Sequence, residues 1–160
     1  MTEYNPFDTA QFGKGEGLAY LDFIKKTLKP FIDKNYRTLK QKEYTYIAGS
    51  SMGGLISFYA GILYPKTFSR IGVFSPSFWV AQNIELLIKS IKPKKLSHQK
   101  YYFYGGGAED PSMISGILKV VDLLSKTARP AVEVVIKPEG YHSEDCWKKE
   151  FPSFYQWLID

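Results

Sequence analysis

The chain has few of the residues from which disulfides and membrane spans are built. Its 160 residues include a single cysteine, Cys146, so no disulfide can form within the chain. No apolar run approaches the length of about 18 residues that a membrane-spanning helix needs. The first residues, Met1 to Asn5, lack a basic stretch followed by an apolar one and do not read as a signal peptide. Together these absences favour a protein of the cytoplasm.

Motifs for metals and cofactors are also missing. The chain has two histidines and no clustered cysteines, so no segment shows metal-ligand spacing. There is no phosphate-binding loop and no dinucleotide fingerprint, and Gly105-Gly106-Gly107 is predicted to be a turn after a strand. We therefore expect neither a metal nor a cofactor.

The charge is moderately basic, with a net charge of +5 and a pI of about 9.1. The lysines are spread along the chain, apart from a cluster at Lys92, Lys94 and Lys95. Binding to nucleic acid would require basic residues on a recognisable motif, and none is found. We interpret the lysines as a solvated surface and expect no nucleic-acid or membrane partner.

Strand-like and helix-like segments alternate, which is typical of a parallel sheet with helices on its faces. The apolar content of 44% suits a globular protein, and the length suits one domain over residues 1–160. Strands are predicted at 44–48, 71–74, 100–104 and 132–136, and helices at 18–32, 52–63, 78–91, 111–127 and 147–159. Pro30 is expected to kink or split the first of these helices.

The segment before the first predicted strand is polar and rich in glycine. Residues 1–17 therefore give no convincing strand, and residues 44–48 become the edge of the sheet if sequential strands pair in order. An open edge invites pairing with another chain. We accordingly expect a domain that is short at its N-terminus and forms a homo-oligomer through this edge.

Residues 44–54 are the most informative segment. A β-branched and aromatic run leads into Gly-x-Ser-x-Gly and then into a helix, the context of a nucleophile elbow. Ser51 has Gly49 and Gly53 two residues away on either side, whereas Ser50 lacks this spacing. Glycines at both positions would let the strand and helix pass closely. The spacing therefore selects Ser51 as the candidate nucleophile.

A serine nucleophile needs a general base, and His142 is the better of the two histidines. It follows the strand predicted at 132–136, and reactive groups in parallel sheets gather at the carboxyl ends of strands. His98 lies in a charged loop and is expected to be a surface residue.

The base needs an acid to orient its ring, and the strand predicted at 100–104 is followed by two candidates. Asp110 precedes Pro111, which favours the first position of a helix, so Asp110 is a good N-cap. Glu109 has no such structural duty and is the favoured acid, with Asp110 as the alternative. The order serine, acid, histidine is that of α/β-hydrolases.

Further residues near these positions have weaker claims. The backbone N–H of Met52 follows the nucleophile and would donate to an oxyanion, while the second donor cannot be placed. Phe78 and Trp79 follow a strand end and could bind substrate or pack in the core. Trp147 could pack beside His142.

Taken together, these segments resemble the esterase D and enterochelin-esterase-like group of α/β-hydrolases, known as the putative esterase family. The matching pieces, from about Tyr4 to Leu158, are Ala19–Ile24, Leu28–Asp33, Ile47–Leu55, Phe74–Trp79 and Gly140–His142 followed by Trp147. The resemblance implies Ser51 as nucleophile and His142 as base. It also implies Glu109 as acid, three residues after a glycine that ends a strand.

By this resemblance the chain corresponds to the carboxyl-terminal part of such an enzyme. The N-terminal strands and the loop that donates the second oxyanion N–H are missing. The family implies a small-molecule ester substrate, whether siderophore, aryl, small acyl or thioester. The leading hypothesis is a serine esterase; the alternatives are a weakly active remnant that serves as an interaction domain, and an acyltransferase.

Overall fold

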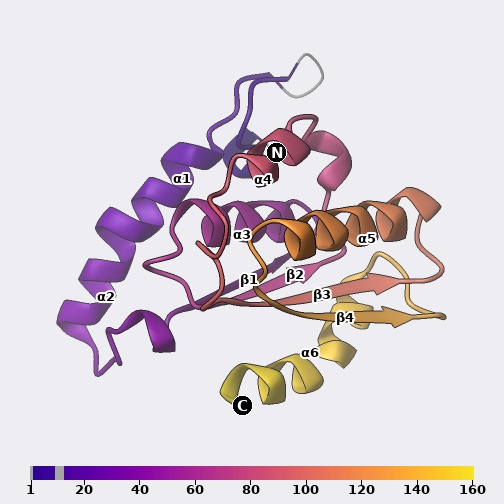
Figure 1. Cartoon of the computed structure of the whole chain (residues 1–160). Coiled ribbons are helices and arrows are strands. Elements are labelled where there is room, and N and C mark those ends of the chain that lie inside the picture. Colours follow the sequence, from indigo (N-terminus) through magenta and orange to yellow (C-terminus); the bar gives the residue numbers. More distant parts are fainter. Residues whose placement is uncertain (1, 10–12) are drawn as a thin grey trace.

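The computed structural model describes residues 2–9 and 13–160, and its centre is a parallel sheet (Figure 1). The strands are β1 (Tyr46–Ser50), β2 (Arg70–Phe74), β3 (Lys100–Gly106) and β4 (Ala131–Lys137). They are hydrogen-bonded in the order β1-β2-β3-β4, and every pair is parallel. The α/β class and the parallel sheet of about four strands predicted from the sequence are confirmed. The first strand begins and ends two residues later than predicted, because Tyr44 belongs to a short helical turn. The third and fourth strands run one or two residues further than predicted.

Helices cover both faces of this sheet. The α-helices are α1 (Gly17–Phe23), α2 (Lys29–Asn35), α3 (Met52–Leu63), α4 (Ile84–Lys89), α5 (Pro111–Lys126) and α6 (Glu144–Ile159). Short helical turns are η1 (Thr2–Tyr4), η2 (Ile24–Leu28), η3 (Lys42–Tyr44) and η4 (Phe78–Val80). Figure 1 shows α3 and α5 above the sheet and α6 below it, so helices lie on both faces, as predicted.

Three helices differ from their predicted extents. The segment predicted as one helix at 78–91 forms η4 and the shorter α4 instead. In the first helix, η2 is a π-helical turn in which the N–H of Lys29 reaches back to the carbonyl of Ile24. Pro30 follows directly. Because proline has no backbone N–H, the wider turn before it leaves no hydrogen-bond donor of Pro30 unpaired. The last helix begins at Glu144, three residues earlier than predicted, because the Ser143 side chain caps it.

The core lies mainly between the sheet and α3. Helix α3 is apolar all round, and residues Gly54 to Ile62 are buried. Alternation along β3 sends Tyr101 and Phe103 toward α3, and sends Tyr102 and Tyr104 into a smaller cluster with Phe154 of α6. Both faces of β2 and β3 are therefore covered, which holds the carboxyl ends of these strands rigidly.

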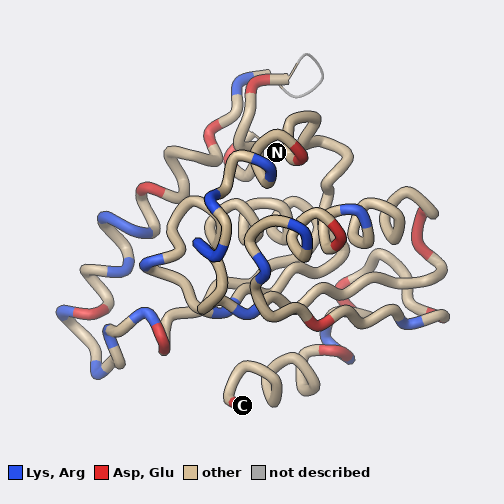
Figure 2. The backbone as a smooth tube through the Cα atoms, in the orientation of Figure 1, with Lys and Arg blue, Asp and Glu red and all other residues tan. Residues whose placement is uncertain are grey.

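The N-terminal arm, α1 to α2, packs less completely than its apolar periodicity predicts. Leu21 is fully buried, but Leu18, Leu28 and Phe31 are 51%, 37% and 56% exposed. The exposed side of the arm is charged, with Lys26 bonded to Asp22 at 2.6 Å. Figure 2 shows these alternating basic and acidic positions along the arm. The arm forms as a helix while part of its apolar stripe stays uncovered.

Strand β1 lies at one edge of the sheet, as predicted from strand order. Its residues are at best partly buried, whereas Ile71 to Phe74 of β2 are all buried. Within residues 2–9 and 13–45 the structure contains no strand, only an isolated bridge between Thr9 and Gly13. Residues 1 and 10–12, which fall in the predicted N-terminal loop, lie outside the described residues.

Lysines and arginines are spread over the helices and loops rather than concentrated on one element (Figure 2). The lysine cluster at Lys92, Lys94 and Lys95 is exposed, and so is His98. Both observations agree with the predicted solvated surface. Across the described part of the chain, no helix combines the length and the apolar character that a membrane crossing requires.

Candidate active site

Ser51 lies in the turn between β1 and α3 with a strained backbone. Its φ and ψ are 56° and −120°, values that residues other than glycine rarely adopt. The turn is fixed from the neighbouring strand, because the N–H of Ser51 donates to the carbonyl of Phe74 at 2.9 Å. Backbone strain that the surrounding structure holds in place is typical of functional positions.

The glycines around Ser51 have different roles from those predicted. A Cβ on Gly49 would lie 2.6 Å from the Gly53 carbonyl, so this position requires glycine. A Cβ on Gly53 would meet nothing within 4 Å. The close approach to the sheet is made instead by Gly54, whose Cβ would lie 2.8 Å from the carbonyl oxygen of Phe74. The prediction that Gly53 is needed for close passage is therefore wrong.

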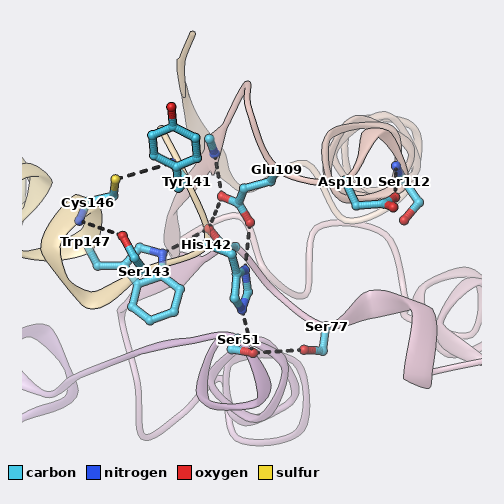
Figure 3. A network of polar contacts seen from close by, with 12 residues as sticks. Ser51, Ser77, Glu109, Asp110, Ser112, Tyr141, His142, Ser143, Cys146 and Trp147 are labelled. Carbon is cyan, nitrogen blue, oxygen red and sulfur yellow. Dashed lines mark hydrogen bonds and ion pairs between the residues drawn. The ribbon is translucent and has the colours of Figure 1, made fainter. Parts of the chain in front are cut away.

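His142 reaches Ser51 from the loop after β4. Its Nε2 lies 3.0 Å from the Ser51 Oγ, and its Nδ1 lies 2.7 Å from Oε2 of Glu109 (Figure 3). The three residues come from loops after β1, β3 and β4, and the parallel sheet brings the ends of these strands to one edge. The structure thus brings together the three residues selected from the sequence.

Glu109 is held on its other oxygen as well. Its side chain is 1% exposed, and Oε1 accepts hydrogen bonds from the Gly106 N–H at 2.7 Å and the Ser75 hydroxyl at 2.6 Å. Gly106 lies against the backbone of Gly140, where any Cβ would collide with the Gly140 carbonyl. The glycine run therefore lets the loop that carries Glu109 touch the loop that carries His142.

Asp110, the alternative acid, does not take part in this chain of contacts. Its carboxylate accepts from the backbone N–H of Ser112 at 2.8 Å and caps α5, as Figure 3 shows. These hydrogen bonds from Ser112 hold the pKa of Asp110 below its usual range. The helix-capping role predicted for Asp110 is confirmed.

The loop that carries His142 is held by hydrogen bonds to the first turn of α6, the helix that follows it. The Ser143 hydroxyl accepts from the backbone N–H of Cys146, and the Tyr141 N–H points to the Cys146 sulfur at 3.3 Å. Hydrogen bonds from Ser143 and Tyr141 lower the pKa of the Cys146 thiol. Cys146 therefore helps to shape this loop.

Two serines after β2 contact the site and were not singled out from the sequence. The Ser77 Oγ lies 3.3 Å from that of Ser51, and the Ser75 hydroxyl bonds to Glu109. Trp147 packs its ring edge to face against His142, with centroids 5.0 Å apart, and donates its indole N–H to Ser75 at 3.0 Å. The signal for both serines was their place at the carboxyl end of a strand beside β1.

The other predicted site residues, Phe78, Trp79 and Met52, differ in their surroundings. Phe78 is buried against Phe58, with ring centroids 5.2 Å apart, and so packs in the core. Trp79 is 58% exposed and lines a cavity of about 310 Å³ that also includes Glu85 and Lys119. Met52 is the first residue of α3, so its N–H has no acceptor within the helix.

No group of three or more His, Cys, Asp or Glu that could hold a metal ion occurs among the residues described. The site consists of a strained serine, a histidine and a buried carboxylate at the carboxyl edge of a parallel sheet. A strand–turn–helix serine with partners in this chain order defines the α/β-hydrolase class of fold.

The family follows from the sequence match. The family model described as "Putative esterase" matches residues 2–156, and the chain belongs to this family. A curated relative, "Uncharacterized protein YbbA" of Bacillus subtilis (strain 168), is 35% identical over 101 residues, which cover 58% of this chain and 40% of that protein.

Solved structures share the fold at low sequence identity. An IroE-like serine hydrolase from Shewanella oneidensis has a TM-score of 0.81 at 19% identity, covering 99% of this chain and 56% of that one. The BES protein from Bacillus cereus gives 0.72 at 18%, covering 98% and 61%. The enterobactin esterase FES from Shigella flexneri, solved with enterobactin, gives 0.72 at 19%, covering 89% and 37%. This chain thus spans less than two thirds of each of these proteins.

Proposed function

We propose that this chain is a serine hydrolase that cleaves carboxylic esters through an acyl-enzyme on Ser51. The observation that carries the proposal is the continuous chain of contacts from the Ser51 Oγ to His142 Nε2 at 3.0 Å and from His142 Nδ1 to Glu109 at 2.7 Å. A serine hydroxyl becomes a nucleophile when a base beside it takes its proton and a third group orients that base.

The first half of the reaction acylates the serine. The Ser51 Oγ attacks the ester carbonyl while His142 Nε2 takes the hydroxyl proton. The backbone N–H of Met52 at the start of α3 donates to the oxyanion that forms. The tetrahedral intermediate then collapses, the bond to the alcohol breaks, and His142 returns the proton to the departing alkoxide.

The second half removes the acyl group. His142 takes a proton from a water molecule, whose oxygen attacks the acyl carbonyl, and the proton passes back to Ser51 as the carboxylic acid leaves. Glu109 accepts the Nδ1–H of His142 and so keeps Nε2 facing Ser51. The His142 side chain is 41% exposed, which gives water access to the acyl-enzyme and favours hydrolysis over acyl transfer.

Family membership and the proteins of similar fold support an ester as the class of substrate. The neighbours include proteins described as serine hydrolases and esterases, one of them solved with enterobactin. Trp79 is the exposed aromatic residue that we propose for substrate contact. The buried side chain of Phe78 would shape this region from beneath.

Hydrolysis of a simple chromogenic ester such as p-nitrophenyl acetate tests the proposal. We expect turnover by the unaltered chain, loss of at least 10³-fold in Ser51→Ala, and full activity in the control Ser125→Ala on the exposed side of α5. A chain that is folded but inactive would favour the interaction-domain alternative. Added methanol that diverts most acyl product into methyl ester would favour an acyltransferase.

A further inference from the structure

The series of hydrogen bonds from Ser51 through His142 to Glu109 continues through Ser75 to Trp147. The Trp147 indole N–H donates to the Ser75 Oγ at 3.0 Å, and the Ser75 hydroxyl lies 2.6 Å from Oε1 of Glu109. Trp147 also touches the other end of the site, because its ring packs edge to face against the His142 ring. One side chain therefore contacts both the base and the support of the acid.

The direction of the Ser75 hydroxyl follows from the chemistry of its neighbours. An indole N–H can only donate, and an ionised carboxylate can only accept. A serine hydroxyl has one hydrogen, so an Oγ that accepts from Trp147 must donate its hydrogen to Glu109. With Gly106 as the second donor, Oε1 is fully occupied and Oε2 is left for His142.

The backbone of Ser75 indicates that this placement is enforced. Its φ is 40°, in the left-handed region that residues other than glycine rarely adopt, and the residue is fully buried. Its N–H donates to the carbonyl of Tyr104 on β3 at 2.8 Å. A strained, buried serine whose hydroxyl and N–H are both paired is more than a space-filling residue.

We infer that Ser75 and Trp147 form a positioning pair for the site: Trp147 orients the Ser75 hydroxyl, Ser75 fixes the Glu109 carboxylate, and the Trp147 ring limits rotation of His142. The inference rests on the proposed function. Neither residue touches the reacting atoms, so both act through Glu109 and His142.

Steady-state kinetics on an ester substrate give the first test. Ser75→Ala removes one hydrogen bond to a charged group and should lower kcat about 10- to 100-fold with KM within twofold. Trp147→Phe keeps an aromatic ring and loses the N–H, so kcat should fall about 3- to 10-fold. Trp157→Phe is the matched control, since Trp157 lies on the same helix but packs on Tyr102.

The double variant shows whether the two residues act as one unit. If Trp147 works through Ser75, the double variant should lose about as much kcat as Ser75→Ala alone, because coupled residues are not additive. Losses that multiply, or a Ser75→Ala enzyme with kcat within twofold of the unaltered chain, would overturn the inference.

A measurement that needs no activity completes the test. The chain has three tryptophans, so its ¹H–¹⁵N spectrum holds three side-chain indole signals, each assigned by its loss in the matching Phe variant. We expect the Trp147 signal to move in Ser75→Ala and also in Glu109→Gln, while the Trp157 signal stays. A Trp147 signal unmoved in both variants would overturn the inference. If the unaltered chain hydrolyses no ester, the proposed function fails, and these spectra still decide whether the pair exists.

Discussion

Replacing Glu109 with Gln should nearly abolish turnover without disturbing the fold. The two side chains have the same shape, so the change is confined to the charge and the hydrogen bonding of this group. The Gly106 N–H cannot rotate away from Oε1, and the Ser75 hydroxyl points there too. The Gln oxygen must therefore take the Oε1 position, which places the amide NH₂ against His142.

An NH₂ group facing Nδ1 donates where the carboxylate accepted. The imidazole would then carry its hydrogen on Nε2, 3.0 Å from the Ser51 Oγ, and could not take the serine proton. A wrong tautomer of this kind lowers kcat by about 10⁴ in a serine protease, which corresponds to roughly 5.5 kcal/mol in the barrier. We expect a similar loss here, with KM changed little.

The matched control is Asp110→Asn, one residue along the chain. Asn caps a helix about as well as Asp, but it lacks the negative charge that is favourable at a helix N-terminus. The change should therefore lower the thermal midpoint slightly while kcat stays within twofold. Kinetics with p-nitrophenyl acetate, together with circular dichroism to show folding, make the comparison. A Glu109→Gln chain that is folded and keeps kcat within tenfold, or a larger kcat loss in Asp110→Asn, would refute the reasoning.

Three other predictions follow from local geometry. Gly53→Ala should raise the thermal midpoint, because the added Cβ meets open space in a helix. Gly49→Ala should lower the midpoint or prevent folding, because its Cβ would collide with Gly53. Equal midpoints for the two variants would contradict the contact geometry. The folded pKa of Asp110 lies below its unfolded value, so its cap contributes stability above the unfolded pKa that is lost as pH falls through the folded one. Stability curves against pH should therefore converge for the unaltered chain and Asp110→Asn in acid. The open edge of β1, flanked by cavities of about 430 and 590 Å³, should pair with a second copy, and sedimentation showing only monomer at tens of micromolar would exclude that.

Much of the sheet and its helices could be predicted because local patterns decided them. The β-branched run before Gly49 and the all-apolar run of α3 have one plausible structure each. The capping role of Asp110 could be derived because Pro111 fixes the start of α5. Strand order followed from the sequence of strands alone.

The rest depended on contacts between distant segments. The break between η4 and α4 and the exposure of Leu18 and Phe31 arise from packing that no local period reveals. Gly54 makes the close contact between helix α3 and the sheet because the backbone of Phe74, at the end of β2, lies opposite it. The place of Ser75 at the end of a strand is visible in the sequence, but nothing there shows that its hydroxyl reaches Glu109, 34 residues away.

The most direct test of the account is intact-mass labelling with a fluorophosphonate, which reacts with a serine only when a working base activates it. The account predicts one adduct on the unaltered chain, mapped to Ser51, and no adduct in Ser51→Ala or His142→Ala. A folded chain that takes up no label, or a label that persists in Ser51→Ala, would contradict it.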